Sequence, residues 1–421
     1  MPLLNKLSPA RTAHSGGSSP ELTRLRVAIT VFFALDGFIF AGWVVRIPAI
    51  KDQTGASASA LGLALLGVSV GGVVTMMLTG RLCRRFGSHP VTVACGVLLS
   101  LAIALPPLTH SALALGGVLL VFGVGYGGIN VAMNSAAVDL VHVLRRPVMP
   151  SFHAAFSLGG MLGAGLGGLV ASHLSPTKHL LMLTVIGLVV TAAAGPTLLR
   201  IEPPTPREPE AETTGSTDTT GAAEPTATPS GSGGRAAPAR KVGVLVILLG
   251  LVALCSSYGE GALADWGALH LHQDLHASPG TAAAGYTLFA LSMMVGRLTG
   301  TTLLERVGST ATVVGGASLA AFGMLLGALA PALWVALAGF ALTGLGLANI
   351  FPVTIGRAGA LSGPGGVAAA STLGYGGMLI GQPAIGFMAD WLTLPSALTS
   401  VALLAAVAAA IGYGTRRATA S

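Results

Sequence analysis

The sequence predicts an all-α membrane protein in which twelve transmembrane helices form two six-helix halves related by a pseudo-twofold axis. Three observations lead to this prediction. First, 52% of the residues are hydrophobic and only 9% are charged, whereas a soluble domain carries about 25% charged residues. Second, twelve apolar stretches are each long enough to cross a bilayer, which takes about 20 residues. Third, short motifs of the first half recur in the second.

The apolar stretches form two groups of six with one polar interval between them. That interval, 200–241, is rich in Pro, Thr, Ser, Gly and acidic residues. Such a composition cannot bury a core, so we expect a disordered linker there. The halves are then 24–199 and 242–415, with a disordered N-terminus at 1–23 and a short tail at 416–421. The predicted spans are 25–48, 58–80, 90–109, 112–136, 151–173, 179–199, 242–265, 281–303, 311–330, 332–355, 367–389 and 394–414.

Basic residues set the orientation of the predicted helices, because cytoplasmic loops of membrane proteins carry an excess of Lys and Arg. Only three of the 22 basic residues, Arg46, Lys51 and Lys178, fall in segments assigned to the outside when the N-terminus is inside. The others, Arg297 among them, are assigned to the inside. We therefore expect both termini and the linker in the cytoplasm. The polar start of the chain shows no cleavable signal, so the first apolar stretch should remain a span.

Short motifs repeat between the halves. Gly-Gly-Met-Leu occurs at 159–162 and again at 376–379. Asp36-Gly37 in the first predicted helix parallels Glu260-Gly261 in the seventh. Parallel six-helix halves joined by a long inner loop predict an axis along the membrane normal, with a solute site between the halves near the middle of the membrane.

Two loops resemble a motif of the major facilitator superfamily. Residues 80–89 read Gly-Arg-Leu-Cys-Arg-Arg-Phe-Gly-Ser-His, and 305–308 read Glu-Arg-Val-Gly; in the first loop Arg84 stands where the superfamily has an acid. The chain is similar to this superfamily over 24–415, and the resemblance implies the major facilitator fold. It also implies a gating role for Gly80, Arg84, Arg85, Gly87, Glu305, Arg306 and Gly308.

Within the superfamily, several stretches resemble a bacterial branch related to fucose permeases and rhizopine permeases. They are Asp36-Gly37, 130–134, 151–157 and 349–352. The resemblance implies proton-coupled uptake of a small sugar or polyol across a bacterial inner membrane. Fucose permeases pair the helix-1 aspartate with an acid in helix 4, where this chain has amides. The run 163–168, Gly-Ala-Gly-Leu-Gly-Gly, resembles instead the antiporter motif of the superfamily, with alanine in place of its proline.

Three ionisable residues, Asp36, Glu260 and His153, are candidates for proton coupling. Asp36 lies near the bilayer centre, where a carboxylate costs about 2.5–3.5 kcal/mol even on insertion scales. Burial favours its protonated form, which can cross uncharged and ionise on meeting water. The alternative is a structural acid hydrogen-bonded between helices. Glu260 and, nearer the surface, Asp265 follow the same reasoning, and His153 is either a proton or gating residue or a group at the headgroup level.

Uncharged polar side chains are candidates for binding the solute. Tyr126, Asn130 and Asn134 recur every four residues and therefore share one face of a helix. Amides both donate and accept hydrogen bonds, which suits a hydroxyl-rich ligand. Asn349 and Gln382 are the corresponding candidates in the second half. The alternative for all the amides is hydrogen bonding between helices.

Trp43 is a further candidate for contact with the solute. It follows Asp36 by seven residues and lies on the same helix face, and Trp266 follows Glu260 in the second half. A flat indole can stack on a sugar ring, whereas the alternative is an aromatic residue at the outer membrane interface.

Other chemistries find little support. Three cysteines without paired spacing predict neither a disulfide nor a metal site. The cluster at 270–276 contains three histidines and one aspartate, and we interpret it as a solvated loop. There is no nucleophile with a base and no phosphate-binding loop, so we expect no enzyme, no cofactor and no nucleic-acid partner.

The sequence therefore favours a proton-coupled secondary transporter for a small polar organic solute, functional as a monomer in the lipid bilayer and working by alternating access. The first alternative is a proton-driven drug or metabolite antiporter. The second is a membrane sensor that uses the fold without transport.

Overall fold

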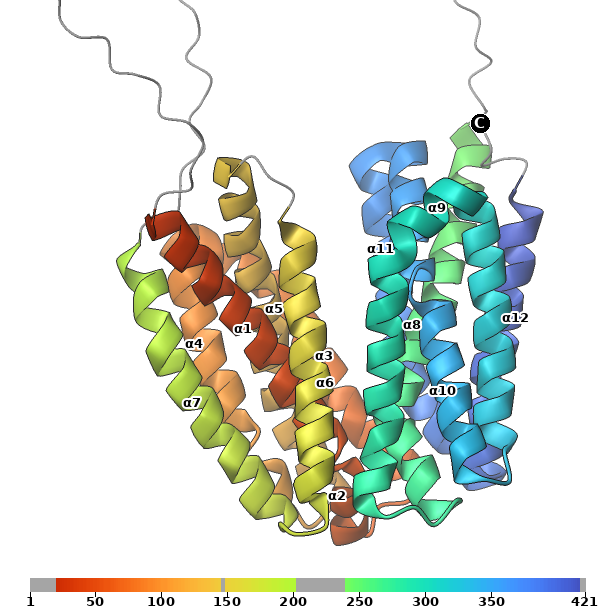
Figure 1. Cartoon of the computed structure of the whole chain (residues 1–421), viewed down its shortest axis with the longest axis horizontal. Coiled ribbons are helices and arrows are strands. Elements are labelled where there is room, and N and C mark those ends of the chain that lie inside the picture. Colours follow the sequence, from red (N-terminus) through yellow and green to blue (C-terminus); the bar gives the residue numbers. More distant parts are fainter. Residues whose placement is uncertain (1–19, 145–147, 202–238, 417–421) are drawn as a thin grey trace, which may run out of the picture.

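The computed structural model describes residues 20–144, 148–201 and 239–416, and within these ranges the chain is helical with no strand. Two groups of helices stand side by side (Figure 1), one from each half of the sequence. The predictions of disorder for the N-terminus, the linker and the tail fall largely on residues outside the described ranges. At their edges the boundaries differ slightly, because helices begin at Pro20 and Ala239 instead of 24 and 242.

The described part of the first half contains six long α-helices, one short α-helix that the sequence did not predict, and a 3₁₀ turn at Pro106–Leu108. The long helices are α1 (Pro20–Val44), α3 (Ala58–Phe86), α4 (Ser88–Ala102), α5 (Ala112–Leu144), α6 (Met149–Ala171) and α7 (Pro176–Arg200). The short helix α2 (Ile47–Thr54) has proline in its first turn and ends at Gly55 with φ 61°, a conformation that glycine adopts without strain. The predicted first span, 25–48, is thus broken after Val44.

The second half consists of α8 (Ala239–Gln273), α9 (Pro279–Leu329), α10 (Leu333–Leu347), α11 (Ile350–Trp391) and α12 (Leu394–Gly414). The 51 residues of α9 would measure about 77 Å if straight, over twice the thickness of a bilayer core. Figure 1 shows that α9 instead doubles back on itself. Helix α11 also turns, since Gly366 packs against the backbone of Ala358, which a straight helix would hold about 12 Å away.

These two turns reconcile the structure with the twelve predicted spans. By length and hydropathy, ten helical segments of the described residues qualify as spans; one is the whole of α9, and another is 333–362, which runs through α10 into α11. Two arms of α9 and the remaining part of α11 complete twelve helical crossings.

Two glycines at corresponding loops share one unusual backbone conformation. Gly87, between α3 and α4, has φ 88° and ψ 153°, and Gly308, between the arms of α9, has φ 79° and ψ 163°. Only glycine populates this region readily. The two copies of the loop motif are therefore built alike.

Glycines also let the helices of each half pack backbone against backbone. Gly159 and Gly163 of α6 lie against the carbonyl groups of Ala34 and Phe38 in α1. In the second half Gly377 of α11 lies against the carbonyl of Leu254 in α8. The contact is made by the first glycine of the Gly-Gly-Met-Leu repeat in the first half and by the second glycine in the second half, so a similar helix crossing occurs twice with the repeat shifted by one residue.

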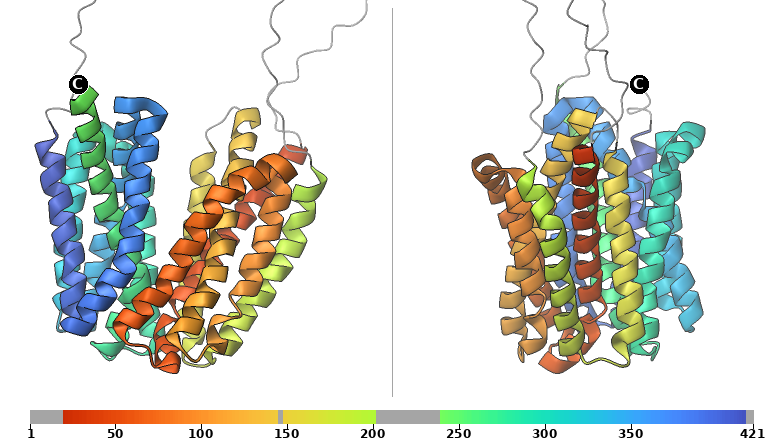
Figure 2. Two further views of the ribbon diagram at one scale, coloured as in Figure 1. Left: turned by 180° about the vertical axis from the view of Figure 1, so that it is seen from behind. Right: turned by 60° about the vertical axis from the view of Figure 1, so that its left-hand side comes forward.

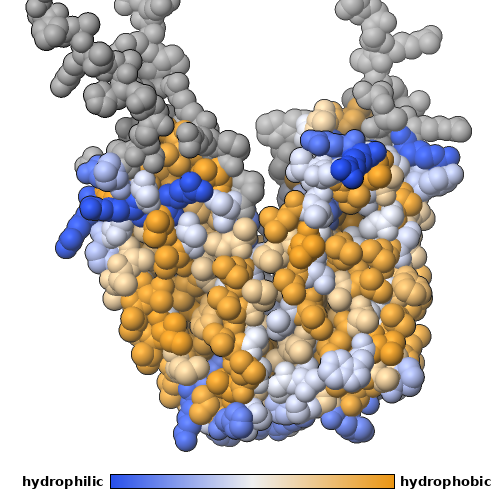
Figure 3. Space-filling model, in the orientation of Figure 1, coloured by the Kyte–Doolittle hydropathy of each residue, from blue (hydrophilic) through white to orange (hydrophobic). Residues whose placement is uncertain are grey.

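The two halves approach each other at one end of the molecule and diverge at the other. We call the end that carries the starts of α1 and α8 and the ends of α7 and α12 the terminal face. Seen from behind, the halves converge at the opposite face (Figure 2). On the face shown in Figure 3, apolar residues cover the middle of both halves and polar residues gather toward the two ends, as expected for a protein surrounded by lipid at its middle.

Candidate functional site

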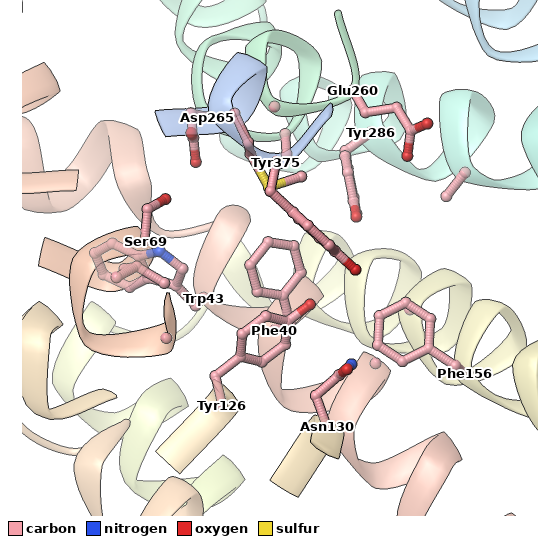
Figure 4. A pocket seen from close by; sticks show the side chains of 18 of the residues that line it. Phe40, Trp43, Ser69, Tyr126, Asn130, Phe156, Glu260, Asp265, Tyr286 and Tyr375 are labelled. Carbon is pink, nitrogen blue, oxygen red and sulfur yellow. The ribbon is translucent and has the colours of Figure 1, made fainter. Parts of the chain in front are cut away.

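A cavity of about 310 Å³ lies between the two halves. Helices α1, α3, α5 and α6 line it from the first half, and α8, α9 and α11 from the second (Figure 4). This volume is at the small end of the range for small-molecule sites, about 300–1,000 Å³. The predicted position between the halves therefore holds a cavity that suits a small solute.

Aromatic side chains form much of the cavity wall. Three of the five tyrosines of the chain line it, although aromatic residues make up only 5% of the sequence. The ring of Tyr126 stacks on Phe40 with 5.0 Å between centroids. The aromatic residues of the wall are Phe40, Trp43, Tyr126, Phe156, Tyr286, Phe289 and Tyr375. Flat rings on both sides suit a ring-shaped solute, and the tyrosines add hydroxyl groups that donate and accept hydrogen bonds.

Among the described residues, the charged groups that line the cavity all come from the second half. Arg297 of α9 forms an ion pair with Glu260 of α8, with 3.3 Å between Nη2 and Oε2. The side chains remain 43% and 21% exposed, respectively, so a solute can reach both. The sequence assignment of Arg297 to a cytoplasmic segment was wrong: it lies inside the first arm of α9. An arginine within the predicted span 281–303 was the signal that could have identified it.

A hydrogen-bonded chain crosses from one half to the other at the cavity wall. Ser69 Oγ of α3 donates to Gln382 Oε1 of α11 at 2.9 Å. Gln382 Nε2 in turn donates to Asp265 Oδ2 of α8 at 3.0 Å. Gln382, predicted as a solute ligand, thus lines the cavity with both ends of its amide already bonded. Sequence reasoning did not single out Ser69, because one serine in an apolar helix has no distinguishing pattern.

Asp36 lies behind the cavity wall. It is fully buried, and among the described residues neither of its carboxylate oxygens has a hydrogen-bond partner. The next residue, Gly37, lines the cavity and packs against the carbonyl of Phe156 in α6. The carboxyl group is therefore sealed beside the α1–α6 crossing, one residue away from the cavity.

The predicted solute ligands divide into two groups. Trp43, Tyr126, Asn130 and Gln382 line the cavity. Asn134 and Asn349 do not. Asn134 Nδ2 donates to the carbonyl of Asn130 in its own helix at 2.7 Å, and Asn349 Nδ2 donates to Gly296 O of α9 at 2.8 Å. Asn349 thus bonds to another helix, as in the alternative considered for the amides, whereas Asn134 bonds within its own helix.

His153 lines a second cavity of about 230 Å³, closer to the terminal face. The two cavities share Asn130, Phe156, Ser157 and Arg297 in their walls. The imidazole ring of His153 lies edge-on to Phe33 at 5.4 Å. The second cavity thus adjoins the central one on the side of the terminal face, and His153 lines it.

The loop residues predicted to act in gating lie at the terminal face, away from the cavity. Arg84, Arg85, Glu305 and Arg306 are exposed there, and Gly80 has open space around it apart from the Arg84 side chain at 3.9 Å.

Two histidines of the cluster at 270–276, on the opposite face, are paired with neighbouring groups of the protein. His270 Nδ1 lies 2.8 Å from Asp274 Oδ2, and His272 Nδ1 lies 2.8 Å from the carbonyl of Ala277. Within the described ranges, no three His, Cys, Asp or Glu residues are grouped so as to hold a metal ion.

Comparison with known proteins places the chain among transporters. The family described as the Major Facilitator Superfamily matches residues 27–259. An uncharacterized MFS-type transporter of Yersinia pestis is 30% identical over 401 residues, covering 94% of this chain and 97% of its own. An uncharacterized transporter of Sinorhizobium fredii, y4wD, is 33% identical over 383 residues, covering 90% and 95%.

Among solved structures, a bacterial homologue of the human lysosomal transporter Spinster, in an inward-facing and unoccupied conformation, has a TM-score of 0.69. It is 13% identical and covers 95% of this chain and 98% of its own. At this identity the likeness shows the fold alone.

Proposed function

The chain belongs to the Major Facilitator Superfamily, and from this premise we propose that it is a proton-coupled symporter for a small, uncharged or weakly charged polar solute of sugar or polyol type. The observation that carries the proposal is the aromatic cavity between the halves with the buried, unpartnered Asp36 directly behind its wall. Solute and proton then have separate but neighbouring sites.

Asp36 supplies the property that a proton carrier needs. In an apolar setting, a carboxyl group without a hydrogen-bond partner has a much lower free energy when it is protonated than when it is ionised. The protonated form can stay sealed while the halves rock, and water entering along α1 favours release of the proton. The proposal therefore makes protonation of Asp36 a condition for the movement.

The cavity favours a solute with a ring and several hydroxyl groups. Rings of Tyr126 and Phe40 on one side and Tyr375 and Tyr286 on the other offer flat apolar surfaces. The amide of Asn130 and the phenolic hydroxyls supply donors and acceptors. The Glu260–Arg297 pair offers one acceptor and one donor of opposite charge, which can bind adjacent hydroxyls.

The direction of movement follows from the orientation in the membrane. Exposed basic residues at the terminal face, among them Arg84, Arg85 and Arg306, support placing that face in the cytoplasm. The cavity then opens inward in this conformation, and uptake ends with release along His153. We place the protein in a bacterial plasma membrane, as a monomer, with both termini in the cytoplasm.

Transport in proteoliposomes with an imposed pH gradient tests the proposal. The wild type should accumulate one or more members of a panel of labelled sugars and polyols. Asp36→Asn should abolish this accumulation yet retain exchange of labelled for unlabelled solute without a gradient, because exchange needs no net proton movement. Asp52→Asn, an exposed acid at the opposite face, is the matched control and should behave as wild type.

A drug antiporter is the second candidate, favoured by the same aromatic walls together with Asp265, which has no cationic partner among the described residues. This candidate predicts that cationic drugs are transported in the direction opposite to that of the protons, and that no sugar or polyol is transported. Accumulation by Asp36→Asn equal to that of the wild type would remove Asp36 from the mechanism in either case.

A further inference from the structure

Gln382 is placed where three helices and both halves meet. Its carbonyl end accepts from Ser69 of α3, and its amino end donates to Asp265 of α8. The side chain is 6% exposed, so its amide has little access to water. A buried amide in this position depends on its two partners, because an unsatisfied buried donor or acceptor is costly.

Gln382 is also the inner end of a line of contacts that closes the opposite face. Gly62 packs against the main-chain carbonyl of Gln382, and Gly386 packs against the carbonyl of Ala58. At the surface, the Asp390 carboxylate accepts hydrogen bonds from the main-chain N–H groups of Ala58 and Ser59, at 2.9 and 2.8 Å. We call this contact, between 58–69 of α3 and 382–390 of α11, the closing seam.

We propose that Gln382 couples occupation of the cavity to opening of the closing seam, by sharing Asp265 between the solute and the seam. The proposal rests on the transport cycle proposed above. Gln382 is a positioning residue in this scheme: it acts on the gate through Ser69 and Asp265.

The chemistry of the three side chains gives the coupling its direction. Asp265 Oδ2 is an acceptor in this structure, so the amino end of Gln382 faces it. This orientation leaves the carbonyl end toward Ser69, which donates its hydroxyl across the seam. Asp265 thus fixes the orientation in which Gln382 can hold Ser69.

A solute in the cavity competes for the same acceptor. A solute hydroxyl that takes the position of the Gln382 amino group at Asp265 Oδ2 leaves that amino group without its partner in a buried position. The closed seam then becomes less favourable relative to the open one, and the opposite face opens with the solute in place. An empty cavity keeps the amide bonded and the seam shut.

The competing explanation is that backbone packing at Gly62 and Gly386, together with Asp390, holds the seam shut by itself. In that case the polar chain is incidental, and removing Ser69 Oγ or the acceptor on Asp265 leaves the gate unchanged. The two explanations differ in the empty protein, so the test needs no identified solute.

Pulsed electron–electron double resonance between spin labels at the opposite face provides the test. Labels at Lys178→Cys and Leu392→Cys, both exposed and in different halves, report the separation of the halves there. The background replaces Cys83, Cys95 and Cys255, and the protein is measured in lipid nanodiscs without solute. Ser69→Ala, Gln382→Asn and Asp265→Ala should each raise the ratio of open to closed populations about fivefold, the change expected for one net hydrogen bond.

Two variants separate coupling from general disturbance. Asp265→Asn keeps an acceptor for the amino end of Gln382 and should leave the distances as in the wild type. Ser135→Ala removes a hydroxyl whose one bond among the described residues is within α5, to Val131 O, and should also leave the distances unchanged. Ser69→Ala combined with Gln382→Asn should open the seam no further than Gln382→Asn alone, because the two residues act in series.

Unchanged distances in Ser69→Ala and Gln382→Asn would overturn the proposal, and so would an equal shift in Ser135→Ala. Because neither a solute nor a proton gradient is used, a failed transport assay and a failed coupling test remain separate results.

Discussion

The two halves use the same helix crossing to hold different chemistry. In the first half, Ala34 packs on Gly159, and two residues further along α1 is the sealed Asp36. In the second half, Leu254 packs on Gly377, and two residues further along α8 is Ser256, also buried. The structural counterpart of Asp36 is therefore Ser256. Glu260, which the sequence parallel paired with Asp36, lies one helical turn further along.

That one turn separates a sealed position from one that lines the cavity. Glu260 and Asp265 face the cavity and have Arg297 and Gln382 as partners, whereas Asp36 has no partner among the described residues. The two halves thus share a backbone arrangement but differ in the ionisable side chains that it positions. We interpret the first half as the proton side and the second half as the source of charge that contacts the solute.

The largest effects should come from the crossings that the halves share. Gly159→Ala and Gly377→Ala place a methyl group against a main-chain carbonyl, and each should lower the free energy of unfolding by about 1–3 kcal/mol. Gly165→Ala and Gly376→Ala, whose new methyl groups meet no atom within 4 Å, are the controls. Thermal unfolding followed by size-exclusion chromatography measures both pairs. Loss of stability in only one half would break the equivalence of the crossings.

Strain at the two loops should be the next largest effect. Gly87→Ala and Gly308→Ala force a side chain into a conformation that glycine alone adopts readily, at a cost of about 1–2 kcal/mol each. Gly80→Ala, in helical backbone with open space, is the control and should not destabilise. Equal losses in Gly87→Ala and Gly308→Ala would show that the loops remain equivalent even though their side chains differ.

Removing the cavity cation sharpens the contrast between proton side and solute side. Arg297→Gln leaves Glu260 without its partner and should raise the KM for the transported solute about tenfold, as for one charge-assisted hydrogen bond of roughly 1.5 kcal/mol. The pH gradient should still drive accumulation, in contrast to Asp36→Asn. Adding Glu260→Gln should recover part of the loss, because it removes the uncompensated charge. Loss of gradient-driven accumulation in Arg297→Gln would instead place proton coupling in the second half.

The smallest effects should follow from removing single hydroxyl groups on opposite walls. Tyr126→Phe and Tyr375→Phe keep the aromatic surface and lose one donor each, worth about 0.5–1.5 kcal/mol, or a few-fold in KM. Initial rates of uptake over a range of solute concentrations measure the change. A kcat loss without a KM change would show that the hydroxyl acts in the movement and not in binding the solute.

Much of the candidate site could be predicted, because a polar side chain within an apolar span avoids lipid and faces either a cavity or a hydrogen-bond partner. Asp36, Tyr126 and Asn130 were identified in this way, and the structure places them in or beside the cavity. Asn134 and Asn349 met the same criterion and yet bond to backbone carbonyls nearby. Hydropathy alone cannot distinguish these cases, because an amide satisfied by a neighbouring helix and an amide facing a cavity occupy equally apolar segments.

The sequence by itself determined the long apolar helices and the glycines at crossings and turns, although not the short helix α2. These depend on the length of apolar runs and on local backbone sterics, which neighbouring residues fix. Tertiary structure alone decided which side chains meet: Ser69 reaches Gln382, 313 residues away, and Gln382 reaches Asp265, 117 residues away. It also turned Arg297 into the cavity toward Glu260. Such contacts depend on the relative rotation and tilt of packed helices, which no local pattern in the chain encodes.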